Sequence, residues 1–217
     1  RSFLGNTVFT SDELGKFVSK YQGRPVTFNE LLNAVAEVGA FYRNEGWVAR
    51  VYVPEQTVDK GTVKLQVIEA VYGKWRLDGE APQNFDLNKI DDVLIAAQPS
   101  GELLNNRRMD RALLLLDDMP GINVVGNYAA GKSAAQTDLL LQIGDEPQFE
   151  GEISIDNFGS RSTGVNRLNG EFYYKSPTQI GDQIKSSVTH SDGNDFIALD
   201  YTRPIGSDGW RFGVNSS

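Results

Sequence analysis

The chain has 217 residues, of which 40% are hydrophobic and 23% charged, a composition typical of a folded protein. Its formal net charge is -8 and it has no run of basic residues, so we expect no nucleic acid partner. Because cysteine is absent and His190 is the only histidine, we also expect no metal site, no cofactor and no catalytic residue.

The first part of the chain predicts one strand followed by two helices. We expect the strand at residues 4–9, and then a helix that Ser11 caps. Thr27 and Glu30 form a capping box that begins a second helix, and Gly46 ends it. The second helix carries an apolar stripe that we assign to the core, formed by Leu31, Leu32, Val35, Val38 and Tyr42.

Two strands are predicted to follow. Residues 47–53 alternate between an inner set that begins at Trp47 and an outer set formed by Val48, Arg50 and Tyr52. The turn residues Asp59, Lys60 and Gly61 then lead into a return strand at residues 63–68. Residues 1–70 therefore predict a unit with the order βααββ.

The same order recurs over residues 71–147. A strand at residues 72–77 precedes one helix after Asp86 and a second helix after Asn105. Pro120 and Gly121 break the second helix, and two strands follow at residues 122–128 and 137–143. Small modules of this kind gain stability by stacking on a neighbour, so we interpret the chain as a tandem repeat.

Residues 148–217 have a different pattern: helical spacing of the apolar residues disappears, and segments in which apolar and polar residues alternate follow one another. In the first segment Phe149, Gly151 and Ile153 oppose glutamate and serine side chains. Such segments, with one apolar and one polar face, are typical of strands in outer-membrane β-barrels, although a soluble sandwich has a similar pattern. Four or five strands do not close a barrel, so we expect these residues to be its beginning and the chain to be a piece of a longer protein.

One motif suggests nucleotide chemistry and needs to be weighed. Residues 126–133 match the phosphate-loop pattern completely, with Gly126, Gly131, Lys132 and Ser133 at its fixed positions. A phosphate loop opens a helix within a parallel sheet, whereas residues 137–143 predict a returning strand. We therefore reject these four residues as a nucleotide site and predict a hairpin loop.

Several motifs resemble a known family. Residues 42–48 (YRNEGWV), 53–56 (VPEQ) and 67–69 (VIE) resemble, in order and spacing, the polypeptide-transport-associated (POTRA) module. Residues 104–105, 119–121 and 130–131 resemble the second such module of the two-partner secretion transporters. Residues 155–160 (IDNFGS) resemble the opening strand of their barrel. The chain is thus similar to the haemolysin secretion and activation proteins of the Omp85 superfamily.

The resemblance implies a non-enzymatic protein of the bacterial outer membrane. Residues 1–70 and 71–147 would be POTRA domains in the periplasm, and residues 148–217 would be the first barrel strands, in contact with outer-membrane lipid. The implied partner is a secreted exoprotein, an adhesin or haemolysin, that is recognised through its N-terminal secretion domain. An assembly factor for outer-membrane proteins, from the same superfamily, is the alternative; two modules directly before the barrel favour the secretion family.

Strand addition is the physical mechanism that such modules offer, because an exposed sheet edge presents unpaired amides and carbonyls to an extended segment. We predict edges at residues 47–53 and 122–128, with Val48, Arg50, Tyr52, Ile122 and Val124 as substrate-binding residues. The alternative, that these strands only complete a sheet, remains open at this point. Unpaired barrel strands also have free edges, so we expect copies of the chain to associate.

Overall fold

A computed structural model describes residues 2–58 and 61–217. The protein is α+β, with two three-stranded sheets and one five-stranded sheet, as the sequence predicts. It divides into two compact units, the first formed by residues 1–76, 98–110 and 128–139 and the second by residues 77–97, 111–127 and 140–217. No helix within the described residues is long and apolar enough to span a membrane.

The first sheet, in the first unit, has β3 (Lys64–Glu69) at its centre. β1 (Ser2–Leu4) pairs with β3 in parallel, and β2 (Ala49–Tyr52) pairs with it antiparallel on the other side. The strand order β1-β3-β2 therefore leaves β2 at an edge, as expected for residues 47–53.

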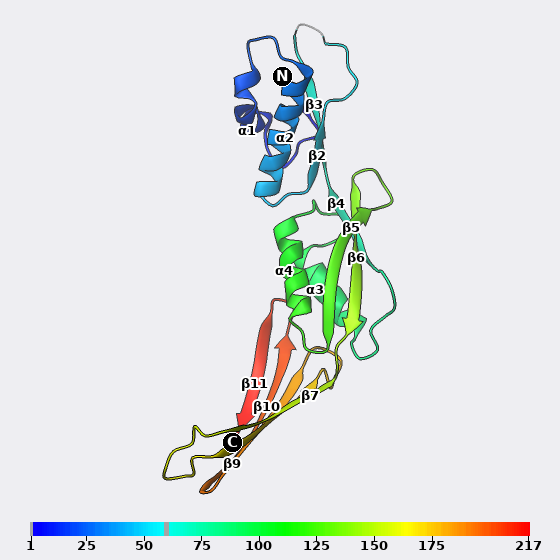
Figure 1. Ribbon diagram of the computed structural model, residues 1–217. Helices are drawn as coiled ribbons and strands as arrows, with labels where there is room; N and C mark the ends of the chain where they lie inside the picture. Colours follow the sequence, from blue (N-terminus) through cyan, green and yellow to red (C-terminus); the bar gives the residue numbers. More distant parts are fainter. Residues whose placement is uncertain (1, 59–60) are drawn as a thin grey trace. The chain divides into compact units, whose positions relative to one another are not determined.

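Helices α1 (Ser11–Phe17) and α2 (Phe28–Asn44), with the short 3-10 helix η1 (Ser19–Tyr21) between them, lie against this sheet (Figure 1). Each contributes buried side chains from one face, so their amphipathic pattern explains the packing. The core of the module consists of Phe3, Leu14, Val18, Tyr21, Ala34, Val38, Tyr42, Leu65 and Val67.

Three local predictions in this module are wrong. The first strand ends at Leu4 instead of continuing to residue 9, because Gly5 has a φ of +80° and turns the chain. Thr10, and not Ser11, is the N-cap of α1, and it forms a capping box with Glu13. Leu32 was assigned to the core but is 47% exposed, and the predicted turn residues Asp59 and Lys60 lie outside the described residues.

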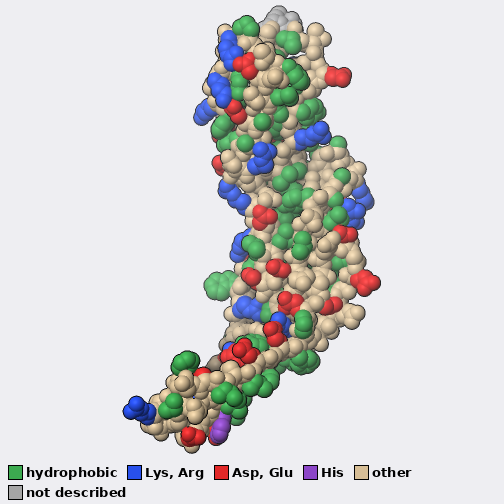
Figure 2. Space-filling model, in the orientation of Figure 1, with side chains coloured by type: hydrophobic (Ala, Val, Ile, Leu, Met, Phe, Trp, Pro, Cys, Tyr) green, Lys and Arg blue, Asp and Glu red, His purple; other side chains and the backbone are tan. Residues whose placement is uncertain are grey.

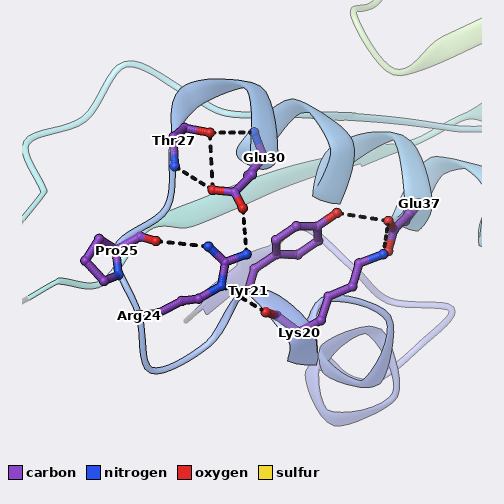
Figure 3. A network of polar contacts seen from close by, with 7 residues as sticks. All are labelled: Lys20, Tyr21, Arg24, Pro25, Thr27, Glu30 and Glu37. Carbon is purple, nitrogen blue, oxygen red and sulfur yellow. Dashed lines mark hydrogen bonds and ion pairs between the residues drawn. The ribbon is translucent and has the colours of Figure 1, made fainter.

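A network of polar contacts joins η1 to the start of α2 (Figure 3). The Thr27 hydroxyl accepts from the Glu30 amide at 3.3 Å, and the Glu30 carboxylate accepts from the Thr27 amide at 2.9 Å, which confirms the capping box. Arg24 donates to the Glu30 carboxylate at 2.6 Å. The hydrogen bonds from Arg24 and then from the Thr27 amide lower the pKa of Glu30 to about 2.

Thr27→Ala tests the cap. We expect it to lower the free energy of unfolding of the first module by about 1 kcal/mol, because one amide at the start of α2 loses its acceptor. Urea denaturation measures the change. Thr57→Ala, at an exposed threonine between β2 and β3, is the matched control and should leave the midpoint unchanged. Equal effects of the two substitutions would contradict a role for the cap.

The second repeat contains five elements in the predicted order. These are β4 (Val71–Leu77), α3 (Leu87–Ala97), α4 (Asn106–Asp117), β5 (Ile122–Ala130) and β6 (Gln136–Asp145), with strand order β4-β6-β5. Asp86 accepts from the Asn88 amide and Asn105 from the Arg108 amide, so both predicted caps are confirmed. Gly121, with a φ of +102°, follows α4 and leads into β5.

The third sheet, in the second unit, is an antiparallel meander of β7 (Phe149–Asp156), β8 (Arg167–Lys175), β9 (Gln183–Ser191), β10 (Asn194–Ile205) and β11 (Trp210–Ser216). Its register places Ile153, Gly170, Val188 and Ile197 side by side on one face. Many large apolar side chains of this face are exposed, and Figure 2 shows hydrophobic side chains on this sheet. The opposite face has polar pairs such as Lys185 with Glu171. The predicted two-faced strands are thus confirmed.

Candidate functional site

The backbone of β2 offers an open edge. The Ala70 amide donates to the Val48 carbonyl at 2.8 Å, which fixes the register of β2 on β3. In an antiparallel pair, alternate residues direct both backbone groups to the partner strand, so Arg50 and Tyr52 bond to β3. The amides and carbonyls of Ala49 and Val51 therefore point away from β3, toward the edge.

The side chains of this strand alternate as predicted. Ala49 and Val51 pack against the core of the module, whereas Arg50 is exposed and Tyr52 half-buried. The Arg50 guanidinium lies 5.6 Å from the centroid of the Tyr52 ring, a cation-π contact. Val48 differs from these two, because its amide donates to the Leu104 carbonyl at 3.2 Å and is therefore not available at the edge.

An exposed apolar stripe on α2 was not predicted as a site. Phe28 is 66% exposed and Leu32 47%, and with the half-buried Val35 they follow helical spacing. The other flank of α2 is occupied by α1 and η1, through the ion pair of Lys20 with Glu37 and the ring contact of Phe17 with Phe41.

This stripe lies toward the open edge of the sheet. α1 adjoins β1, α2 adjoins β2, and β1 and β2 are the opposite edges of one sheet. The flank of α2 that faces away from α1 therefore faces the β2 edge. We call the open backbone edge at Ala49 and Val51, together with the exposed stripe of Phe28, Leu32 and Val35 on the neighbouring helix, the β2 edge site. Its signal in the sequence is a second apolar stripe on α2, beside the buried stripe of Ala34, Val38 and Tyr42.

A buried carboxylate joins three segments of the first module, namely the end of β3, the loop after β1 and helix α2. Glu69, at the end of β3, accepts from the amides of Thr7 at 2.9 Å and Val8 at 3.0 Å, from the Thr7 hydroxyl, and from the Tyr42 hydroxyl at 2.8 Å. Burial alone would raise the pKa of Glu69, but these hydrogen bonds outweigh burial and hold it below its ordinary value. Burial, with the bond to Glu69, raises the pKa of Tyr42 far above its usual range.

A hollow of about 660 Å³ lies on the opposite side of this module, lined by residues of β1, α1 and η1. Apolar side chains such as Phe3, Val18 and Leu65 line it together with Asp12 and Lys16. In the described part of the chain, no three His, Asp or Glu side chains gather into a set that could hold a metal ion.

The second predicted edge, β5, is partly closed. Ile122 is fully buried and Val124 is 6% exposed, so both side chains fill the core, and substrate binding by these two residues stays a prediction that rests on their backbone. The Gly131 amide donates to the Gln136 carbonyl. The odd-numbered residues of β5 therefore direct their backbone amides and carbonyls toward β6, and the even-numbered residues direct theirs toward the edge. At that edge the Val124 amide already donates to Asp117 at 2.9 Å.

The phosphate-loop match forms a hairpin, as predicted. Gly126 belongs to β5, Gly131, Lys132 and Ser133 form the connection, and β6 follows in place of a helix. The Gly131 amide donates to the Gln136 carbonyl at 2.8 Å and the Lys132 amide to the Gln136 side chain at 3.2 Å. Two amides that would cradle a phosphate are therefore engaged.

Two family models cover most of the chain. Residues 2–70 match the ShlB-type POTRA domain, and residues 135–217 match the haemolysin secretion/activation protein ShlB/FhaC/HecB. The chain therefore contains a ShlB-type POTRA domain and a segment of the haemolysin secretion/activation protein family.

Curated relatives that are named as transporters align over most of the chain. The heme/hemopexin transporter protein HuxB of Haemophilus influenzae (strain 86-028NP) is 28% identical over 98% of the chain, which spans 38% of HuxB. The outer membrane transporter CdiB of Dickeya dadantii (strain 3937) is 24% identical over 87% of the chain and 33% of its own length. The chain thus corresponds to well under half of each relative.

Solved structures support the fold of the chain. CdiB from Escherichia coli has a TM-score of 0.72 and 20% identity, covering 93% of this chain and 37% of that one. BamA from Haemophilus ducreyi lacking POTRA domains 1-3 has a TM-score of 0.61 and 17% identity, covering 98% and 41%. At such identities the likeness shows the fold alone. The assembly-factor alternative therefore gains no support beyond fold, whereas the family models favour the secretion transporters.

Lys132→Ala tests the rejection of the nucleotide site in this chain. We expect no nucleotide-dependent rise in melting temperature for the unaltered chain, and hence none for the variant to remove, because a ligand raises stability only when it binds the folded state. Differential scanning fluorimetry with ATP and Mg²⁺ measures this. A shift that the substitution abolishes would restore the phosphate-loop interpretation.

Proposed function

We propose that this chain is the substrate-recognition part of an outer-membrane transporter that exports a large exoprotein by two-partner secretion. It captures the extended N-terminal secretion domain of the exoprotein by strand addition at the β2 edge site. The observation that carries the proposal is the open edge of β2 beside an exposed apolar stripe on α2. The chain acts as a binding module and not as an enzyme.

The chemistry of capture follows from the two parts of the site. An incoming strand exchanges backbone hydrogen bonds with Ala49 and Val51, each of which contributes about 1 kcal/mol net. Its alternate side chains lie toward α2, where Phe28 and Leu32 lose exposed apolar surface on contact. The other side chains lie beside Arg50 and Tyr52. Backbone bonds supply affinity for an extended chain, and the stripe selects apolar residues at every second position.

We propose that residues 1–70 and 71–147 are POTRA domains in the periplasm and that residues 148–217 begin the barrel, with the apolar face of β7 to β11 toward lipid. The exposed apolar side chains of that face support this orientation. The edges of β7 and β11 are unpaired in this chain, so self-association through them remains a prediction.

Ala49→Pro tests strand addition. The Ala49 amide points to the open edge, so proline removes a donor there without breaking a bond to β3. We expect binding of the exoprotein's secretion domain, measured by calorimetry, to weaken by about tenfold, the equivalent of about 1.4 kcal/mol. Ala130→Pro removes an edge-facing amide of β5 and is the matched control. Loss of binding with Ala130→Pro alone would move the site to the second module.

A further inference from the structure

The connection between β8 and β9, residues 176–182, is built unlike an ordinary hairpin turn. Ser176 and Gln179 have φ values of +52° and +65°, and no other non-glycine residue in the described ranges has a positive φ. Ser176 and Asp182, which flank the connection, are both fully buried. Left-handed backbone at non-glycine residues is costly and persists only where its surroundings impose it.

Internal hydrogen bonds close this turn. The Asp182 carboxylate accepts from the Thr178 amide at 3.1 Å and from the Tyr201 hydroxyl of β10 at 3.0 Å. The Ser176 hydroxyl accepts from the Gly181 amide at 3.1 Å, and the Ser176 amide donates to the Asp182 carbonyl at 2.6 Å. The conformation is therefore fixed by two polar side chains that water does not reach.

The segments around α3 and α4 in the second unit lie directly on this turn. The Asp86 amide, just before α3, donates to the Gln179 carbonyl at 2.7 Å. A Cβ atom on Gly121 would come within 2.7 Å of the Ser176 Cβ, and one on Gly181 within 2.9 Å of the Met119 Cβ. Both contacts are tighter than real side chains allow, so glycine is required on one side of each.

A second connection makes similar contacts. Lys89 of α3 donates to the Gly206 carbonyl, and Arg111 of α4 donates to the Asp208 carbonyl at 3.0 Å. These bonds join the long side chains of the half-buried Lys89 and the exposed Arg111 to carbonyls of the β10–β11 turn. By contrast, the β8–β9 turn contributes buried groups and a strained backbone, so it is the more specific of the two contacts.

We propose that the β8–β9 turn is a docking element that fixes the α3 and α4 ends of the second module on the five-stranded sheet. Ser176 and Asp182 are its positioning residues: they hold the Gln179 carbonyl toward the Asp86 amide and keep Gly181 against Met119. This role concerns how the second unit is held together and does not depend on which polypeptide the transporter carries.

Amide hydrogen exchange, followed by NMR on the full chain, tests the proposal. Asp182→Asn keeps the size of the side chain but replaces one acceptor oxygen by a donor. We expect exchange at the Asp86 amide to accelerate by about tenfold or more, because its acceptor is no longer held in place. The amides of Val93 in α3 and Val188 in β9 report on folding of the unit and should not change.

Three further variants complete the experiment. Tyr201→Phe removes a single hydrogen bond to Asp182, so it should accelerate exchange at the Asp86 amide less than Asp182→Asn does. If Asp182→Asn does not fold, exchange at Asp86 in Tyr201→Phe tests the proposal in its place. Ser176→Ala loses the bond to Gly181 and retains the strained φ, so it should have a larger effect than Ser176→Gly. An unchanged Asp86 amide while Thr178 exchanges faster would show that the turn is a local structure only and would overturn the proposal.

Discussion

Leu32→Asp is expected to weaken binding of the secretion domain by about 30-fold, which corresponds to about 2 kcal/mol at the centre of an interface. Leu32 is 47% exposed on the flank of α2 that faces the β2 edge, so a bound strand would cover it. Aspartate at this position would be desolvated without a partner on binding, whereas in the free protein it remains hydrated. The loss should therefore appear in affinity and not in folding.

A control on another helix separates this effect from a general change in charge. Leu114 on α4 is 64% exposed, so Leu114→Asp introduces the same side chain at an equally apolar surface position. Calorimetric titration should give the unaltered affinity for Leu114→Asp and the weakened one for Leu32→Asp. Equal affinities for the two variants would show that the stripe on α2 is not part of the site.

Glu69→Ala is expected to destabilise the first module by about 3 kcal/mol. Glu69 accepts from the buried Tyr42 hydroxyl and from the amides of Thr7 and Val8, and alanine leaves these donors without an acceptor. Urea denaturation measures the loss. Glu102→Ala removes a carboxylate of an exposed ion pair with Arg108 and should change stability by less than about 1 kcal/mol. A Glu69 variant as stable as the Glu102 variant would contradict the role of the network.

The same carboxylate predicts the pH dependence of the first module. Its pKa is lower in the folded protein than the unfolded value of about 4.3, so the folded state favours the charged form. The resulting stabilisation is fully present above the unfolded pKa and is lost as the pH falls through the lowered folded pKa. Denaturation midpoints between about pH 7 and pH 3 should therefore fall less steeply in Glu69→Gln than in the unaltered chain.

Local rules were sufficient to predict most of the fold. The capping box of Thr27 and Glu30, the cap at Asn105 and the break at Gly121 each involve residues a few positions apart, so the sequence alone determines them. Alternation likewise separated the inner and outer faces of β2 and of the meander, because strand geometry has a strict period of two.

Long-range contacts account for several of the predictions that failed, whereas the cap at Thr10 instead of Ser11 is a local effect. The Thr7 and Val8 amides bond to Glu69, a residue 62 positions from Thr7, in place of continuing a strand, and no local pattern reveals this. Leu32 has the spacing of a core residue, and only the position of α1 on the other flank of α2 leaves it exposed. The bond from the Val124 amide to the Asp117 carboxylate spans only seven positions, but the strand pattern of β5 does not indicate that a side chain occupies its edge.

Hydrogen exchange at the β2 edge tests strand addition most directly. In the free protein the Ala49 and Val51 amides face the edge and should exchange rapidly, whereas those of Arg50 and Tyr52 bond to β3 and should exchange slowly. On addition of the secretion domain, we predict that Ala49 and Val51 become protected while Arg50 and Tyr52 change little. Unprotected Ala49 and Val51 amides in a saturated complex, with new protection along β5 instead, would contradict capture at the β2 edge site.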